Sequence, residues 1–183
     1  RVRVGDAQPV PFGVAVPQPV VAAGIGVMVA EELHRACAAE AAAAILGITL
    51  LLDWVVATDW WLAPPGIEPP GQLGPALCMP HLAARIDHSV LTLTTAGGGG
   101  EARVLGDLAL PIADAVAFVS QRRQLEPGDV VGIDALPPRA VAWGEAVTLT
   151  LADPGGRQRM QLCGSASRGP GRVPWRSTAA VAV

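Results

Sequence analysis

The chain has 183 residues, 51% of them hydrophobic, and a formal net charge of −3 at pH 7. That length can bury one substantial core and leaves little room for two full domains. The acidic balance excludes the basic field that wraps a nucleic acid backbone. The longest apolar run, Ala41–Leu52, falls short of the roughly 20 residues that span a bilayer. Neither nucleic acid nor a membrane is an expected partner.

The three cysteines lie far apart in the sequence, at Cys37, Cys78 and Cys163. They show neither the close pairs of a zinc site nor the even count of a disulfide framework. Free thiols in a reducing compartment are the ordinary interpretation of such a pattern. We therefore expect a cytoplasmic protein.

The first half of the chain alternates between apolar segments and a proline-rich loop. Val20–Val29 is apolar throughout, which is typical of a strand that is buried on both faces. Glu31–Leu46 is rich in alanine and has acidic residues in its first turn, and Gly47 follows it, so it is predicted to be a helix. Ile48–Val56 is predicted to be a second buried strand, and Trp60–Gly74 a long loop.

Two β-hairpins are predicted in the second half. Ser89–Thr95 alternates polar and apolar residues, meets four glycines at Gly97–Gly100, and resumes at Glu101–Leu105. Glu145–Ala152 and Arg157–Cys163 flank the turn sequence DPGG in the same way. Both pairs are expected to form antiparallel ribbons.

Between the hairpins, Pro111–Gln121 has apolar residues in helical register and a proline suited to the first turn. The string LEPGDVV then predicts a turn at Glu126–Asp129 and a strand at Val130–Ile133. We expect a single domain over residues 1–163 and a flexible tail over residues 164–183, where serine, glycine, proline and arginine predominate. The fold class is α+β, rich in strands, with two main helices.

Four strings in this order resemble the catalytic domain of the fumarylacetoacetate hydrolase family over residues 4–163. They are GDAQPVPFGVAVPQPVVAAGIGVMVAEEL, AAAAILGITLLLDWVVATD, LGPAL and PIADAVAFVSQRRQLEPGDVV. The resemblance implies a mixed β-roll, usually a homodimer, with the active site at the mouth of the roll. Members of the family bind magnesium, manganese or calcium through two glutamates and an aspartate. They hydrolyse, decarboxylate or isomerise compounds with adjacent oxo and enol oxygens.

The resemblance puts Ala22 and Gly24 where the family has its two glutamates, while Asp53 matches the aspartate. One carboxylate holds Mg²⁺ poorly, because the hydrated ion gives up its waters reluctantly. Glu31 and Glu32 are the remaining candidate ligands, and their place at a predicted helix start favours surface acids that stabilise the helix dipole. We therefore expect no metal and no cofactor.

Apolar and aromatic residues replace the family's polar set. Trp54, Trp60 and Trp61 are expected around the mouth, and Ile133 and Leu136 stand where hydroxyl side chains would contact substrate. Together with the small residues at the two former glutamate positions, they are the predicted substrate-binding residues. A tryptophan suits a conjugated ligand, and the alternative is that these tryptophans fill the core or a dimer interface.

Asp53 and Asp134 are the predicted catalytic residues. An aspartate within an apolar strand is costly when ionised and unpaired, so Asp53 is neutral, hydrogen-bonded, or a functional acid with a raised pKa. Asp134 either faces the same cavity or caps a loop. His34, His81 and His88 are not arranged with a nucleophile and an acid, so a serine hydrolase triad has no support.

The predicted function is a metal-independent enzyme that shapes a small, apolar, conjugated substrate containing a carbonyl group. A cyclase or isomerase in polyketide-like biosynthesis fits best, because positioning alone can lower the barrier of an intramolecular cyclisation or cycloaddition by several kcal/mol. One alternative is a metal-dependent hydrolase or decarboxylase of oxo-enol acids. The other is a non-catalytic structural partner subunit.

Overall fold

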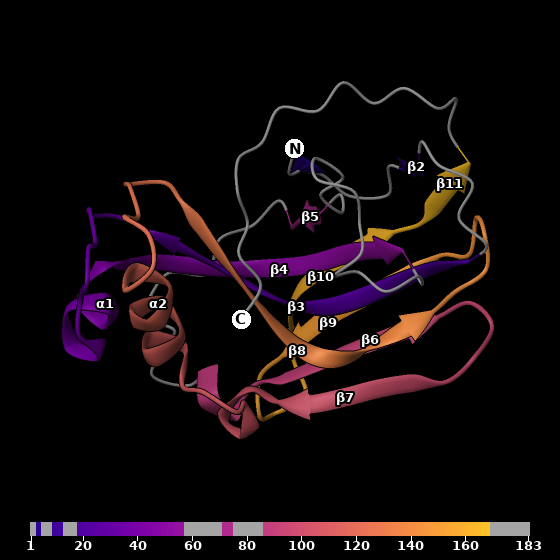
Figure 1. Cartoon of the computed structure of the whole chain (residues 1–183). Helices are drawn as coiled ribbons and strands as arrows, with labels where there is room; N and C mark the ends of the chain where they lie inside the picture. Colours follow the sequence, from indigo (N-terminus) through magenta and orange to yellow (C-terminus); the bar gives the residue numbers. More distant parts are fainter. Residues whose placement is uncertain (1–2, 5–8, 13–17, 57–70, 75–85, 169–183) are drawn as a thin grey trace.

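The computed structural model describes residues 3–4, 9–12, 18–56, 71–74 and 86–168. Two sheets lie one above the other, and the two α-helices lie side by side at one end of them (Figure 1). The elements in chain order are β1 (Arg3–Val4), β2 (Val10–Phe12), β3 (Pro19–Val29), α1 (Ala38–Ala44), β4 (Ile45–Val56), β5 (Gly71–Leu73), β6 (Val90–Thr95), β7 (Gly100–Val104), η3 (Leu105–Asp107), α2 (Ile112–Ser120), β8 (Val130–Ala140), β9 (Val147–Ala152), β10 (Gln158–Gly164) and β11 (Ala166–Arg168).

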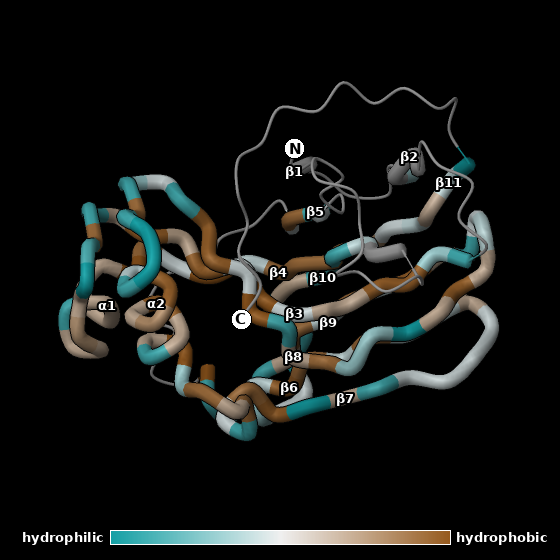
Figure 2. Tube along the Cα trace, viewed as in Figure 1, coloured by the Kyte–Doolittle hydropathy of each residue, from teal (hydrophilic) through white to brown (hydrophobic). Residues whose placement is uncertain are grey.

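The larger sheet has the strand order β1-β5-β4-β3-β8, and its long central strand β3 pairs antiparallel with both β4 and β8. The second sheet has the order β10-β9-β6-β7 and is antiparallel throughout. Side chains alternate between the two faces of a strand. The odd-numbered residues of β3 from Val21 to Val29 belong to the main core cluster, together with residues of the second sheet and of the helices. Strands β3 and β4 are largely hydrophobic along their length (Figure 2).

The structure corrects the first predicted helix. Only Ala38–Ala44 is helical within Glu31–Leu46, and the strand β4 begins directly after it. Leu33 instead forms an isolated antiparallel bridge with Leu125, through two backbone hydrogen bonds of 3.0 and 2.8 Å. Gly47 lies inside β4 rather than capping the helix. The tertiary pairing of this segment therefore overrides its helix propensity.

The other elements follow the prediction more closely. Both hairpins are confirmed, as β6 with β7 and β9 with β10, and the second helix is confirmed as α2. Strand β8 continues to Ala140 rather than ending at Ile133, and β5 lies within the predicted long loop. Residues Ala166–Arg168, assigned to a tail, form a strand that pairs with β2, and residues 169–183 lie outside the described part. No helix of the described part is long and apolar enough to cross a membrane.

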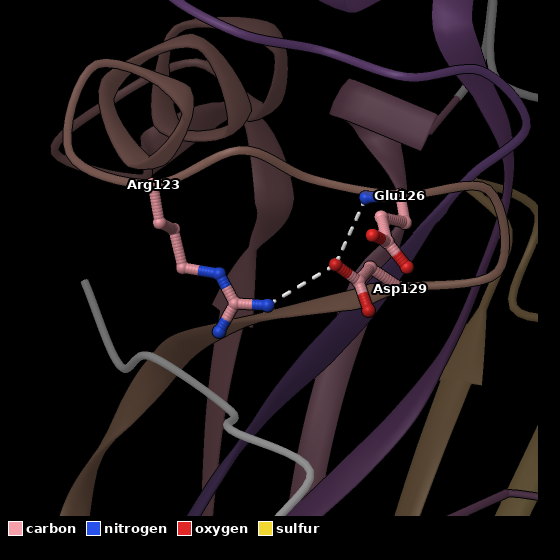
Figure 3. Close-up of polar contacts among 3 residues, drawn as sticks. All are labelled: Arg123, Glu126 and Asp129. Carbon is pink, nitrogen blue, oxygen red and sulfur yellow. Dashed lines mark hydrogen bonds and ion pairs between the residues drawn. The ribbon is translucent and has the colours of Figure 1, made fainter.

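The turn that precedes β8 is stabilised by the carboxylate of Asp129 (Figure 3). Asp129 Oδ2 accepts the backbone N–H of Glu126 at 3.0 Å and lies 3.1 Å from the Arg123 guanidinium. Gly128 takes φ +92°, a conformation that glycine adopts without steric cost. Its N–H donates to the carbonyl of Val29 at 2.8 Å, and the Val29 N–H donates to the carbonyl of Asp129 at 3.0 Å. The turn is therefore bonded to the end of β3, which sets β8 beside it.

Candidate functional site

The two predicted catalytic aspartates lie on the same face of the larger sheet. Asp53 of β4 is directly opposite Ala22 of β3, and Asp134 of β8 is opposite Gly24. Residues opposite each other in an antiparallel pair point to the same side. The neighbour of Asp53 in the chain, Trp54, points the other way into the core. The aspartates therefore flank the centre of β3 on the face turned away from the core.

The environment of these side chains disfavours their ionised forms. Burial, and secondly the charge of Asp134, raise the pKa of Asp53 from its ordinary value of 3.8 to about 6, against the opposing effect of a hydrogen bond from the Trp54 amide. Burial also raises the pKa of Asp134. The side chain of Asp134 is exposed, whereas that of Asp53 is half-buried. Burial therefore raises the pKa of Asp134 less than that of Asp53. The pair thus contains an acid whose pKa lies much closer to neutral pH than that of an ordinary aspartate, a property common in functional sites.

Strand β3 lies between the two aspartates and carries only small residues there, Ala22 and Gly24. A Cβ atom placed on Gly24 would run into the carbonyl of Ile133, so any side chain at this position requires the backbone to move. The same face contains Gly132, where a Cβ would lie 2.9 Å from Leu51 Cδ2. Leu51 and Leu73 are buried on this face, and neither belongs to the main core cluster. The surroundings of the two carboxyl groups are therefore small and apolar.

The predicted substrate-binding residues do not all share this face. Trp54 is fully buried, and its indole N–H donates to Gln72 Oε1 at 2.9 Å. It therefore fills the core instead of contacting a ligand beside the carboxyl groups. Ile133 and Leu136 are also buried members of the core cluster rather than neighbours of the carboxyl groups. Ala22 and Gly24 do lie between the aspartates. Trp60 and Trp61 lie outside the described residues.

Two residues of this face, Leu51 and Leu73, were not singled out from the sequence. The signal for Leu51 was present, because it lies two residues before Asp53 in the same strand and must share its face. No comparable signal existed for Leu73, because β5 was read as part of a loop and its pairing with β4 depends on tertiary structure.

The comparison with protein families decides the identity of the fold. The family model described as "Fumarylacetoacetate (FAA) hydrolase C-terminal" matches residues 2–160. The chain belongs to the fumarylacetoacetate hydrolase family. The predicted family and its α+β fold with two helices are thus confirmed. No curated protein sequence gives a significant match.

Solved structures of fumarylacetoacetate hydrolase family proteins share this fold. One is a putative fumarylacetoacetate isomerase/hydrolase from Oleispira antarctica, with a TM-score of 0.73 and 19% identity over 88% of this chain and 76% of that one. A family protein from yeast has a TM-score of 0.76 and 15% identity over 93% and 75%. Fumarylpyruvate hydrolase from Pseudomonas aeruginosa, in complex with Mn²⁺ and pyruvate, has a TM-score of 0.70 and 16% identity. The match covers 91% of this chain and 75% of that one. At such identities the likeness shows the fold alone.

The described residues do not fit the divalent ion that the fumarylacetoacetate hydrolase family implies. Hard cations such as Mg²⁺ and Ca²⁺ take oxygen ligands, whereas the resemblance puts Ala22 and Gly24 at the two glutamate positions. Within the described ranges there is no group of three His, Cys, Asp or Glu side chains that could hold a metal. Glu31 and Glu32 follow the far end of β3, roughly 17 Å or more along the strand from Gly24. Among the described residues of β3, β4 and β8, the carboxyl groups on this face are those of Asp53 and Asp134.

Proposed function

We propose that this chain is a metal-independent enzyme of the fumarylacetoacetate hydrolase family that moves a proton on an apolar, conjugated carbonyl compound. The observation that supports it is the pair of carboxyl groups, Asp53 and Asp134, on one face of the sheet, with the pKa of Asp53 raised to about 6. General acid–base catalysis is most efficient when the pKa of the catalytic group lies near the operating pH. The reaction is an isomerisation or an intramolecular cyclisation.

The two carboxyl groups have complementary roles in this proposal. Asp53, as the carboxylic acid, donates its proton to the carbonyl oxygen of the substrate, while the carboxylate of Asp134 removes a proton from the adjacent carbon. A C–H bond breaks and an O–H bond forms, which gives the enol. Return of a proton at a different carbon of the conjugated system completes an isomerisation. In a cyclisation, the enol carbon attacks a second carbonyl of the same chain and forms the C–C bond while the enol O–H returns its proton to the Asp53 carboxylate. The new alkoxide takes the proton that Asp134 holds.

The surroundings of the pair favour an uncharged substrate. The described residues of β3, β4 and β5 contain no lysine or arginine. The one arginine of β8, Arg139, reaches instead to the carbonyl of Gly98 at 3.2 Å. Two acidic groups repel the carboxylate of an oxo-acid. A neutral polyketide-like chain, made in natural-product biosynthesis, has the conjugated carbonyls and hydrocarbon surface that fit this face.

Benzoylacetone, a neutral aromatic 1,3-diketone, offers a direct test because its enol absorbs in the ultraviolet. We expect the protein to accelerate the keto–enol conversion in the presence of EDTA. Asp53→Asn and Asp134→Asn should each lower that acceleration by about 10²–10⁴-fold, the usual contribution of a positioned acid or base. Asp87→Asn, which changes an exposed aspartate far from the pair in sequence, is the matched control.

The same assay separates the rival functions. Conversion that requires added Mn²⁺, with a rise in melting temperature at low Mn²⁺ concentration, would favour a metal-dependent hydrolase or decarboxylase and contradict the proposal. Acceleration that neither aspartate variant changes would contradict the catalytic roles of Asp53 and Asp134. No acceleration of any kind would favour a non-catalytic partner subunit.

A further inference from the structure

Leu51 of β4 lies in a row of residues that crosses the larger sheet beside the two carboxyl groups. Its cross-strand partners are Leu73 of β5 and Gly24 of β3. Gly24 is in turn opposite Asp134 of β8. Asp53 follows Leu51 by two residues in the same strand, so both side chains point to the same side of the sheet. Leu51 is therefore next to Asp53 along the strand, and only a glycine stands between it and Asp134 across the sheet.

The side chain of Leu51 extends across β3 toward β8. A Cβ atom placed on Gly132 of β8 would lie 2.9 Å from Leu51 Cδ2, although β3 runs between the two strands. On β3, Gly24 is the partner of Leu51, and the next residue on the same face is Gly26. Because neither glycine has a side chain, the isobutyl group of Leu51 can lie over the backbone of β3. It therefore occupies the space on this face between the strands that carry the two aspartates.

The place of Leu51 in the packing differs from that of its neighbours in β4. Leu50 and Leu52 belong to the main core cluster, whereas Leu51 is buried, with an exposed fraction of 6%, outside that cluster. A hydrocarbon side chain offers neither a proton nor a hydrogen bond to a substrate. Its effect on binding depends on its volume, and one methylene group in an apolar site changes specificity by roughly 10–200-fold. The choice of substrate can therefore depend on the space that Leu51 fills.

We propose that Leu51 is a specificity-determining residue, whose side chain limits the size of the hydrocarbon group that a substrate can place between Asp53 and Asp134. The inference rests on the proposed function, because it takes these two carboxyl groups as the centre of the site. A carbonyl compound held by both groups lies across β3, where its substituents meet the isobutyl group of Leu51. A methyl substituent needs little of that space, whereas a phenyl ring competes with Leu51 for it.

Equilibrium dialysis with two neutral 1,3-diketones tests this role. Benzoylacetone ends in a phenyl and a methyl group, and dibenzoylmethane ends in a phenyl group on both sides. Leu51→Ala vacates the space over β3 and should shift the ratio of the two dissociation constants toward dibenzoylmethane by about tenfold or more. Leu51→Val removes less of the side chain and should shift the ratio in the same direction by a smaller factor. Leu52→Ala and Leu52→Val make the same changes on the core side of the same strand, so they should leave the ratio unchanged.

Gly132→Ala acts on the same side chain from β8. The added methyl group would lie 2.9 Å from Leu51 Cδ2, at the flexible end of that side chain, so Leu51 has to move. We expect the ratio to shift toward benzoylacetone, because the new methyl group and the displaced leucine take up more of the face. In the Leu51→Ala background this shift should largely disappear, since residues in contact have non-additive effects. A purely structural effect of Gly132→Ala would be the same in both backgrounds.

Circular dichroism reports whether each variant is folded, and Leu51→Val decides the outcome if Leu51→Ala does not fold. A ratio that neither Leu51 variant shifts relative to the Leu52 controls, or a protein that binds neither diketone, would overturn the proposal. The keto–enol conversion of benzoylacetone distinguishes this failure from that of the proposed function. If conversion depends on the two aspartates while the ratio stays constant, the proposed function stands and the role of Leu51 is wrong. If the ratio shifts without any conversion, Leu51 controls binding on a face that is not catalytic.

Discussion

Replacing Asp53 by asparagine should make the protein more stable and less active. The pKa of Asp53 rises from 3.8 to about 6 in the folded chain. That difference corresponds to about 3 kcal/mol of free energy, which is an upper value because the side chain keeps some contact with solvent. A carboxyl group with a raised folded pKa costs nothing well below pH 3.8. Its cost grows as pH rises toward 6 and is fully present above that.

Asparagine has nearly the same shape as aspartate, it keeps an oxygen that can accept the Trp54 amide, and it carries no charge. We therefore expect Asp53→Asn to raise the free energy of unfolding by about 2–3 kcal/mol at pH 8 and to leave it nearly unchanged at pH 3.5. Urea titrations followed by circular dichroism at the two pH values measure both quantities, with Asp87→Asn as the matched control. A stabilisation that is equal at both pH values, or a loss of stability at pH 8, would refute the electrostatic reasoning. A gain in stability with a loss of activity is the trade-off typical of a functional residue.

Further substitutions at three residues follow from the described contacts. Asp134→Asn removes the charge that contributes to the raised pKa of Asp53, so that pKa should fall, as measured by the ¹³C chemical shift of the carboxyl carbon during a pH titration. Trp54→Phe removes a buried hydrogen bond to Gln72 and part of a core side chain, and thermal unfolding should show a loss of roughly 1–3 kcal/mol. Asp129→Ala removes both contacts drawn in Figure 3 and should cost about 1–2 kcal/mol in a urea titration, whereas Asp129→Asn should keep part of the turn bond.

Much of the fold was predictable because its signals are local. The apolar segment around β3, the glycine-rich hairpin turn and the LEPGDVV string each contain their own geometric cause, and each forms the predicted element. The alanine-rich segment before β4 failed for the opposite reason. Its first half is held by a bridge from Leu33 to Leu125, a residue more than ninety positions away in the chain. Helix propensity contains no information about such a partner.

The candidate site was predictable in part. Asp53 stood out because a carboxyl group within an apolar strand is costly, and its raised pKa agrees with that reasoning. Trp54 was expected beside it, yet adjacent residues of a strand face opposite sides, and this one faces the core. The position of Asp134 depends on irregular pairing in β8, where Leu136 is opposite Ala23 and Asp134 is opposite Gly24. A shift of register of this kind leaves no mark in the pattern of hydrophobic residues.

The close approach of Gly24 to the carbonyl of Ile133 bears on how this chain can evolve. A ligand lost by substitution alone can return by a single reversion. Here the carbonyl of Ile133 in β8 occupies the volume that a side chain at position 24 would need, so a glutamate there demands a concerted change in two strands. Substitutions of the neighbouring side chains can therefore change the chemistry of this face more readily than a single substitution can place a carboxylate at position 24.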